Sequence, residues 1–584
     1  MNSAIAIAST LAAAAIFRLL TCYLLFSTNY ATVDDDDILS RALGPGILRA
    51  ISAAILDPVH TWDHLEEACF WLDDNFHRSA SVFSGNGTTN DAGYGAIYTP
   101  GTRIVAPPLV IAFLGQPLVC RPNSIFLRVL QSLILTIADG VGAYCIYWLG
   151  CRIVQGENMS NEAEMERHTV LSESCEDGDE ALNKDLVIPE ILRPDMGWTI
   201  DLPSKRLPTD NCSKVRLVDG GVSCNNNNQV EGNHIDNGKP AIKDAISATP
   251  LLDREPLLLL DQVPIIASLC YFGNPISMLA NATGTLRSLW DALLLLSLYY
   301  STMPVTDLAK EGVSNKIPSA TKVAMFLALA TYADAGYAMF LFPILLWRGL
   351  LQSPTLISKI QHYDWKSVLL LYILHLGGLH YFASLLVGDG PSAYKKVLVQ
   401  TILPNVAFVQ QDSSGSVPGP SMGLHWYMFV QLFDRFRPYF SLFISGLPAM
   451  FVLPLMIRLY RYPCALAAIF QLLWAIFRPT TTVHTLTLGL HLALLNPRTI
   501  VRMRYPSLIS FFALPVPISL FITFHRMWLV TGNGNPNYIF FQCLAYGMFV
   551  MIITMDFVSG TVKRDKVRRM IEKGTVKKLL NKDE

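Results

Sequence analysis

The stretch from Tyr505 to Gly560 decides the fold that we predict for this chain. It holds two apolar arms, Tyr505–Val530 and Tyr538–Gly560, joined by the polar sequence TGNGNPN at 531–537. Each arm is long enough to cross a bilayer, because about 20 apolar residues in a helix span the ~30 Å of hydrocarbon. Asparagine, glycine and proline in the connection favour a tight turn over a helix. The stretch therefore predicts a hairpin of two membrane-spanning helices.

Basic residues on both flanks of this hairpin predict its orientation. Three arginines precede Tyr505, and nine basic residues against four acidic ones follow Gly560. Short segments rich in Lys and Arg are retained on the cytoplasmic side of a membrane. We therefore expect both flanks to be cytoplasmic and the turn at 531–537 to face the opposite compartment. The basic residues are Arg498, Arg502, Arg504, Lys563, Arg564, Lys566, Arg568, Arg569, Lys573, Lys577, Lys578 and Lys582.

The composition of the whole chain is that of a membrane protein. Of its 584 residues, 51% are hydrophobic and only 16% are charged, and the mean hydropathy is +0.35. These values exclude an ordinary soluble enzyme. The apolar runs, counted from a retained first span at Ser3–Phe26 to the hairpin, predict an all-α polytopic membrane protein with about twelve transmembrane helices.

Polar segments divide the apolar runs into parts. Residues 1–150 hold the first spans and a polar loop at 27–103, which we expect on the lumenal side. Residues 257–560 hold the other spans and a second polar lumenal segment at 388–438. Residues 561–584 form a basic cytoplasmic tail.

A long polar insert separates the two sets of spans at 151–256. From Arg152 to Pro256 it carries twenty acidic and eleven basic residues, with a run of four asparagines at 225–228. Such a composition cannot bury enough apolar surface to offset the entropy lost on ordering. We predict a disordered insert on the cytoplasmic side.

Acidic residues within the apolar runs mark places where the membrane pattern is broken. The run Thr321–Trp347 contains Asp334, and an unpaired carboxylate in mid-bilayer is costly. We therefore predict two short helices that meet at Asp334 and leave both Lys322 and Arg348 on the cytoplasmic side. Asp139 and Asp291 are candidate intramembrane functional residues. Their alternative role is pairing with Arg128 or Arg287.

Two clusters in the first polar loop resemble parts of enzyme sites. The run Asp34–Asp37 supplies carboxylates that act as a base or hold a metal in some lipid-linked sugar transferases, but four consecutive aspartates also form an ordinary solvated run. His60 and His64 would share one helix face, yet two histidines are too few for a metal site. An amphipathic interfacial helix anchored by Trp62 accounts for the same residues.

Recognisable catalytic motifs are not found in the sequence. It has no GxSxG motif, no Walker A loop and no Cys/His arrangement typical of a protease nucleophile. Its eleven cysteines show no CxxC pairing, so we expect no metal centre, no cofactor and no nucleic-acid partner. Cys69 and Cys120 are able to pair in an oxidising lumen, and Asn86 begins a glycosylation sequon.

The sequence GLHWYMF at 423–429, followed by Asp434 between Phe433 and Phe436, resembles the U subunit of the glycosylphosphatidylinositol (GPI) transamidase complex. Further segments of the chain look like segments of that family in the same order. They are Leu56–Pro58 with Trp62, Ala106–Leu109, Phe272–Pro275, Ala328–Tyr332, Trp528, Asn535–Asn537 and Asp556.

This resemblance implies a non-catalytic subunit of an endoplasmic-reticulum complex. The complex cleaves a C-terminal signal from a proprotein and attaches a preformed GPI lipid, and its catalytic cysteine belongs to another, cysteine-protease-like subunit. The implied partners are the other transamidase subunits, the GPI lipid and membrane lipids. The implied fold is similar to that of the multi-span GT-C glycosyltransferases.

Two departures from the family pattern leave a second function open. The insert at 151–256 is longer than the family's cytoplasmic loop, and the run Asp34–Asp37 is not part of the pattern. The alternative is a GT-C type lipid-linked mannosyltransferase of GPI or dolichol-sugar biosynthesis, in which the aspartates would carry out catalysis.

The resemblance also implies candidate GPI-binding residues. Asn535 and Asn537 carry amides that can donate to glycan hydroxyls or phosphate oxygens, but the same side chains also satisfy tight turns. Tryptophan and tyrosine are enriched at membrane interfaces without a specific ligand. The candidates are Asn535, Asn537, His425, Trp426, Tyr427 and Asp334.

Overall fold

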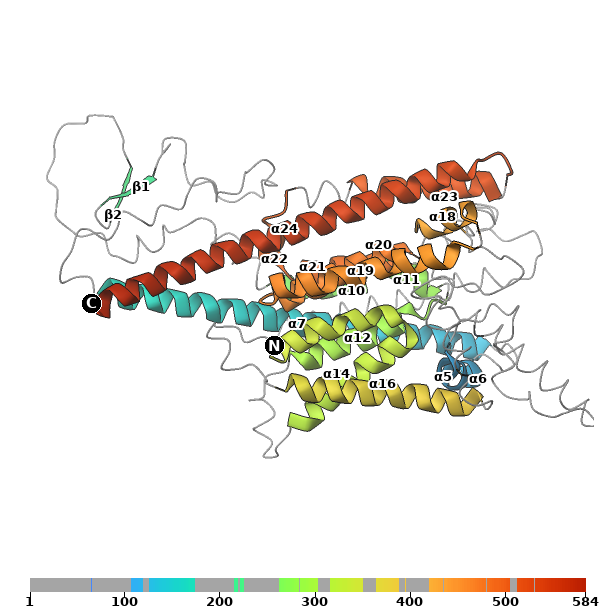
Figure 1. Ribbon diagram of the computed structural model, residues 1–584, viewed down its shortest axis with the longest axis horizontal. Helices are drawn as coiled ribbons and strands as arrows, with labels where there is room; N and C mark the ends of the chain where they lie inside the picture. The colour runs from blue at the N-terminus through green and yellow to red at the C-terminus, as the bar shows by residue number, and fades with distance from the viewer. Residues whose placement is uncertain are drawn as a thin grey trace, which may run out of the picture.

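The computed structural model describes part of the chain, and every structural statement below concerns that part. The described residues are 65, 107–118, 125–173, 215–218, 221–224, 262–282, 284–302, 316–349, 364–387, 394, 420–433, 435–478, 481–504, 512–529 and 531–583. They form a bundle of roughly aligned helices, with one short hairpin of strands beside its end (Figure 1).

The first part of the bundle is built on the long helix α7 (Ile125–Glu173). Helices α10 (Val263–Phe272) and α12 (Arg287–Ser301) pack against it. The hydroxyl of Ser268 donates to the carbonyl oxygen of Ala143 at 2.9 Å, which joins α10 to α7. Helix α10 ends at Phe272 with Gly273 as its cap, and α11 (Pro275–Ala282) begins at Pro275, because proline is favoured in the first turn of a helix.

The chain reverses at Asp334, as the sequence predicted. Helix α14 (Lys316–Ala333) ends there, and the 3-10 helix η5 (Ala335–Phe340) and α15 (Leu341–Trp347) return. Asp334 caps η5 by accepting a 3.0 Å hydrogen bond from the Gly336 backbone N–H. Arg348 follows α15 and donates to Ser319 near the start of α14 at 2.9 Å. The two segments therefore form a hairpin.

Among the remaining helices, α16, α19, α20 and α21 follow predicted apolar runs, whereas α18 lies in the segment 388–438 that was predicted to be polar, and α23 as described begins at Pro515. Helix α16 packs along α14, α20 packs against α19 and α21, and α23 and α24 form the last hairpin. The bounds are α16 Trp365–Val387, α18 His425–Gln431, α19 Arg437–Leu459, α20 Pro463–Phe477, α21 Val483–Leu494, α22 Pro497–Ile500, α23 Pro515–Leu529 and α24 Pro536–Asp583.

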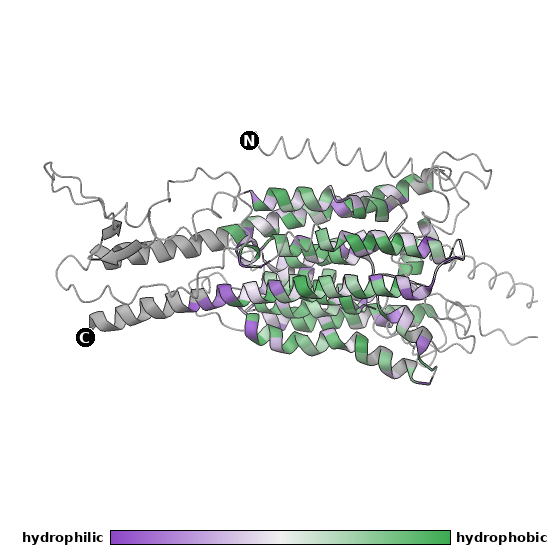
Figure 2. Cartoon of the chain, turned by 90° about the horizontal axis from the view of Figure 1, so that it is seen from above, coloured by the Kyte–Doolittle hydropathy of each residue, from purple (hydrophilic) through white to green (hydrophobic). Residues whose placement is uncertain are grey.

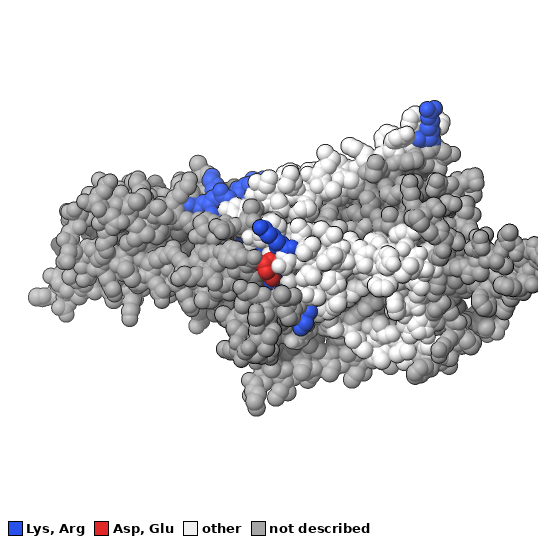
Figure 3. All heavy atoms as spheres, turned by 60° about the horizontal axis from the view of Figure 1, so that its bottom comes forward, with Lys and Arg blue, Asp and Glu red and all other residues white. Residues whose placement is uncertain are grey.

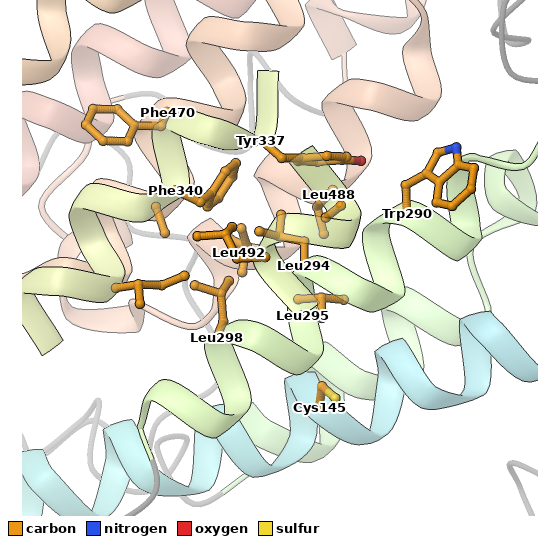
Figure 4. Close-up of a cluster of buried hydrophobic side chains, with 14 of the residues drawn as sticks. Cys145, Trp290, Leu294, Leu295, Leu298, Tyr337, Phe340, Phe470, Leu488 and Leu492 are labelled. Atoms are coloured by element: carbon orange, nitrogen blue, oxygen red, sulfur yellow. The ribbon is translucent and has the colours of Figure 1, made fainter. Parts of the chain in front are cut away.

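A continuous apolar core joins the helices from α7 to α16 with helices α19 to α21. Figure 4 shows side chains from α7, α12, η5, α20 and α21 gathered in one cluster. Cys145, Leu294, Leu298, Tyr337 and Phe470 are all buried there. Helix α12 packs against both α7 and α14, and its Arg287 and Asp291 side chains are buried inside the protein.

Four helices in the described residues are long and apolar enough to cross a membrane. Their spans are Val129–Val154, Val263–Asn281, Trp365–Val387 and Pro536–Lys566, and shorter apolar helices lie among them. Figure 2 shows hydrophobic colour along the bundle and hydrophilic colour where α24 leaves it. The described protein is thus a helical membrane-type bundle. Helix α16 is the most exposed of these spans, with 17% of its apolar window buried.

Two helices extend beyond their predicted ends. Helix α7 does not stop at Gly150 but continues to Glu173, and α24 does not stop at Gly560 but continues to Asp583. The α7 extension is rich in glutamate and the α24 extension is rich in lysine and arginine. These residues are good helix formers and allow each helix to continue without an apolar environment. A change from apolar to charged sequence therefore does not mark the end of the helix.

Other predicted segments are described only in part. The insert contains an antiparallel hairpin of β1 (Val215–Val218) and β2 (Gly221–Cys224). The proline-rich segment after 106 forms α5 (Pro108–Val110), the π-helical turn η2 (Ile111–Gly115) and α6 (Gln116–Leu118). The expectations for Asp34–Asp37, His60, His64, Cys69, Asn86 and Cys120 fall outside the described residues.

Candidate functional site

The turn between α23 and α24 is folded back onto the end of α23. The backbone N–H of Asn533 donates to the carbonyl oxygen of Met527 at 3.0 Å. Gly532 has a φ of 69°, a value that glycine adopts without steric cost. A Cβ atom on Gly534 would lie 2.7 Å from the backbone nitrogen of Trp528. Both glycines are therefore needed for this compact turn.

Helix α18 lies against the hairpin and contacts it through stacked aromatic rings. Tyr427 stacks on Phe540 with ring centres 4.1 Å apart, and Trp426 stacks on Trp528 at 6.2 Å. The segment before α18 is fixed as well, since the thiol of Cys543 donates to the carbonyl oxygen of Ser421 at 3.2 Å. These contacts bring residues 421–427 and the turn at 531–537 together, although they are far apart in sequence.

The two candidate asparagines are exposed and linked to each other and to α18. The Asn535 side-chain oxygen accepts a 2.9 Å hydrogen bond from the Asn537 backbone N–H. This bond stabilises the start of α24, where Pro536 is the first residue. The Tyr427 hydroxyl donates to the Asn537 side-chain oxygen. Among the described residues, no hydrogen bond from either side-chain NH₂ group is found.

His425 and Trp426 lie behind this surface. Their side chains are 1% and 2% exposed, so they support the site from below. Burial lowers the pKa of His425 to about 4, because the cationic ring would lose its hydration inside the protein. His425 is therefore neutral at physiological pH. The role of His425 as a GPI-binding candidate stays a prediction.

Asp334 belongs to a different part of the molecule. Its carboxylate lies 2.6 Å from Nη1 of Arg287 on α12 and 3.3 Å from Nη2 of Arg478 after α20, and all three side chains are fully buried. The structure thus brings Tyr427, Asn535 and Asn537 together at the hairpin. It places Asp334 in a buried ion network that joins three elements of the core.

The two other aspartates that the sequence singled out in apolar runs also have partners. Asp291 lies 3.8 Å from Arg287, as the pairing alternative predicted, and accepts a hydrogen bond from Tyr337. Asp139 accepts hydrogen bonds from Ser277 at 2.9 Å and from Asn281 at 2.5 Å. Both carboxylates help to join helices in the core.

Sequence reasoning missed several contacts at these sites. Arg478 was not singled out, although an arginine directly after the apolar run Pro463–Phe477 was a usable signal. Phe540 was missed because a phenylalanine in a membrane span is unremarkable by composition. The described residues contain no cluster of three or more His, Cys, Asp or Glu side chains able to hold a metal ion.

Comparison with known proteins extends over most of the chain. A sequence model of the family described as GPI transamidase subunit PIG-U matches residues 92–546, which include α18 and the turn at 531–537. That match covers more than three quarters of the chain and shows the family.

Curated relatives match over a shorter region. The GPI transamidase component GAB1 homolog of Schizosaccharomyces pombe is 32% identical over 146 residues, 25% of this chain and 36% of the relative. GPI transamidase component GAB1 of Saccharomyces cerevisiae is 28% identical over 138 residues, 24% of this chain and 34% of the relative. The GPI-anchor transamidase component PIGU of Homo sapiens is 25% identical over 156 residues, 26% of this chain and 35% of the relative. The aligned regions thus span about a third of each relative, and the family match over residues 92–546 assigns the chain to the GPI transamidase subunit PIG-U family.

Proposed function

We propose that this chain is a non-catalytic subunit of a GPI transamidase and that its α23–α24 turn contacts the polar head of the GPI lipid. The family match and the names of the relatives support the subunit role. The catalytic cysteine is supplied by a cysteine-protease-like partner subunit. The complex resides in the endoplasmic-reticulum membrane, with the turn on the lumenal side.

One observation carries the assignment of the turn. Asn535 and Asn537 present exposed amides at the end of two apolar helices, and Tyr427 stacked on Phe540 supports them. A GPI lipid has acyl chains in the bilayer and a phosphorylated glycan at its surface. It therefore requires apolar surface in the membrane and hydrogen-bond donors just above it. The apolar surface is available, because Tyr538, Phe541 and Leu544 on α24 are exposed.

The rest of the proposed architecture follows from the apolar pattern. The four long spans and the shorter apolar helices belong to a bundle of about twelve transmembrane helices, of the GT-C glycosyltransferase-like kind. In this arrangement the hairpin and α18 form the lumenal rim of the subunit. The chain contributes positioning of the lipid, while bond cleavage and formation occur on the partner.

The variant Asn535→Asp tests ligand binding while it keeps the hydrogen bond that forms the turn. Asn535→Asp keeps the oxygen that accepts from the Asn537 N–H, so the start of α24 is preserved. It replaces the NH₂ donor with a negative charge, which repels a phosphate. In cells that lack their own U subunit, we expect assembly with partner subunits to be retained and surface display of a GPI-anchored reporter to fall.

The matched control is Asn533→Ala in the same turn. Asn533 contributes its backbone N–H to Met527, and alanine retains that group. We expect normal assembly and normal reporter display for this variant. If Asn535→Asp also supports normal display, the turn does not contact the lipid. If the wild-type chain brings down no cysteine-protease-like partner on purification, the subunit role itself is wrong.

A further inference from the structure

Nine basic side chains lie at the end of the bundle where α24 leaves its apolar part. They come from the end of α19, from α22 and the residues around it, and from α24 just past its apolar segment. Figure 3 shows most of the visible Lys and Arg at one end of the uncharged surface, with one further group at the opposite end. We call this set the basic patch: Arg458, Arg461, Arg498, Arg502, Arg504, Lys563, Arg564, Lys566 and Arg569.

A buried carboxylate fixes two members of the basic patch. Asp565 is 1% exposed and lies 2.5 Å from Nη1 of Arg458 and 3.0 Å from Nε of Arg569. Both arginines nevertheless remain more than 40% exposed. One carboxylate cannot neutralise two guanidinium groups, so Asp565 holds the arginines in place while they keep a net positive charge toward solvent.

Close packing joins the other elements of the basic patch into one surface. A Cβ atom on Gly560 would lie 2.8 Å from the carbonyl oxygen of Thr499, so α24 and α22 are in direct contact. The backbone N–H of Arg504 donates to Asp556 at 2.8 Å. The Arg564 guanidinium lies 4.8 Å from the centre of the Tyr462 ring. The charges therefore lie on a packed scaffold.

The charge of this surface is strongly unbalanced. The described parts of α19 to α22 and of α24 up to Arg569 contain two acidic residues, Asp556 and Asp565, against the nine members of the basic patch. Lys563, Lys566 and Arg504 are exposed. Like charges held close together repel one another unless an anion lies between them.

The basic patch also lies at a defined level relative to the membrane. The apolar span of α24 ends at Lys566, so Lys563 and Lys566 occupy its last turn. Phospholipid headgroups lie at the ends of membrane-spanning segments. We propose that the basic patch binds anionic phospholipid headgroups in the leaflet at this end of the bundle. This site lies at the opposite end of α24 from the turn at 531–537, and it does not depend on the proposed GPI contact.

A lipid-retention experiment tests this proposal on the full chain with any partner subunits that co-purify. The protein is placed in nanodiscs of phosphatidylcholine with or without phosphatidylserine, extracted, and its retained lipids are measured by mass spectrometry. We expect phosphatidylserine to be enriched over its share of the nanodisc. Lys563→Gln with Lys566→Gln should reduce that enrichment by about fivefold for each lysine. Added salt should weaken the enrichment for the wild-type chain.

The matched control is Lys322→Gln with Lys366→Gln, which removes the same charge at the same end of the bundle. Lys322 lies over the Tyr300 ring. Arg348 donates to the Tyr300 carbonyl oxygen and also lies 3.3 Å from Asp364, which precedes α16. These contacts place Lys322 and the start of α16, which carries Lys366, at the same end of the bundle. Both lysines are exposed and lie outside the basic patch.

We expect the control variant to retain phosphatidylserine like the wild-type chain. Equal loss in both variants would mean that general positive charge is responsible, and it would overturn the proposal. The absence of enrichment in the wild-type chain would do the same. Tighter binding of a soluble acidic peptide than of phosphatidylserine nanodiscs would assign the surface to a protein partner.

Discussion

Arg287 on α12 donates to Asp334 between α14 and η5 at 2.6 Å, and both side chains are fully buried. Arg478 approaches the same carboxylate at 3.3 Å. Three elements that are far apart in sequence therefore meet at one carboxylate. In an apolar interior each of these charges requires its partner, because an unpaired buried charge is much less stable than a paired one.

Removal of the carboxylate should destabilise the bundle strongly. Asp334→Ala leaves two buried arginines without this partner, and loss of one member of a buried ion pair costs about 3–5 kcal/mol. We expect a lower thermal midpoint in detergent and a lower yield of folded protein. Lys322→Gln, which removes an exposed charge, is the control and should leave both unchanged. A wild-type midpoint for Asp334→Ala would show that the network does not stabilise the fold.

The close contact between Gly336 and Trp474 provides a second test of the same region. A Cβ atom on Gly336 would lie 2.0 Å from Cε2 of the Trp474 ring. Gly336→Ala should therefore destabilise the protein by about 1–3 kcal/mol through overpacking. Thermal unfolding of the purified variant measures this.

Two further variants make the Gly336 prediction specific. Gly377 in α16 has no atom within 4 Å of an added Cβ, so Gly377→Ala should be neutral or slightly stabilising. Gly336→Ala combined with Trp474→Leu should be less destabilised than the two single changes together, because the clash is gone. Strict additivity of the two changes would argue against direct contact.

The sequence predicted the bounds of some helices closely, because apolar runs and the residues that flank them are local signals. The run Pro463–Phe477 is helix α20 with the same bounds, and the run Val483–Leu495 is α21 with an end one residue earlier. Pro463 begins α20 and Arg478 follows its last residue, so the limits of the apolar run coincide with those of the helix. The reversal at Asp334 was also predictable, since an aspartate in an apolar run needs a special environment.

The contacts between distant residues were not predictable in the same way. Tyr427 and Asn537 are 110 positions apart, and no local pattern pairs a tyrosine with one of several asparagines. Arg478 reaches Asp334 only because η5 packs against α20. The resemblance named segments at α18 and the hairpin that lie together in the structure, and it also grouped with them Asp334, which lies elsewhere. Sequence spacing alone carries no information on which buried charges share a partner.

The buried neutral histidine of α18 predicts a pH dependence. Burial lowers the pKa of His425 from its ordinary value of 6.5 to about 4. The unfolded chain therefore binds a proton below pH 6.5 that the folded chain binds only near pH 4. Stability from this residue is complete above pH 6.5 and is lost as the pH falls from 6.5 toward 4.

Substitution of this histidine isolates its contribution. Thermal midpoints of the wild-type chain and of His425→Gln, measured across pH 4 to 6.5, should show a shallower pH dependence for the variant. Other histidines titrate in both proteins, so their contribution cancels in the difference. Parallel curves for the two proteins would mean that His425 is not held neutral by burial.

The hydroxyl of Tyr427 links α18 to the turn. A variant without this hydroxyl tests whether Tyr427 only supports the asparagines or itself contacts the lipid. Tyr427→Phe keeps the stacking on Phe540 and removes the hydrogen bond to Asn537. Loss of one such partly exposed bond costs about 0.5–1.5 kcal/mol, so folding and assembly should be retained. Because the Asn537 amide is then less firmly oriented, we expect reporter display to fall, but by less than in Asn535→Asp.

Tyr427→Ala, which also removes the stacked ring, should lower display further. If Tyr427→Phe reduces display more than Asn535→Asp does, the hydroxyl itself contacts the lipid and the asparagines are secondary.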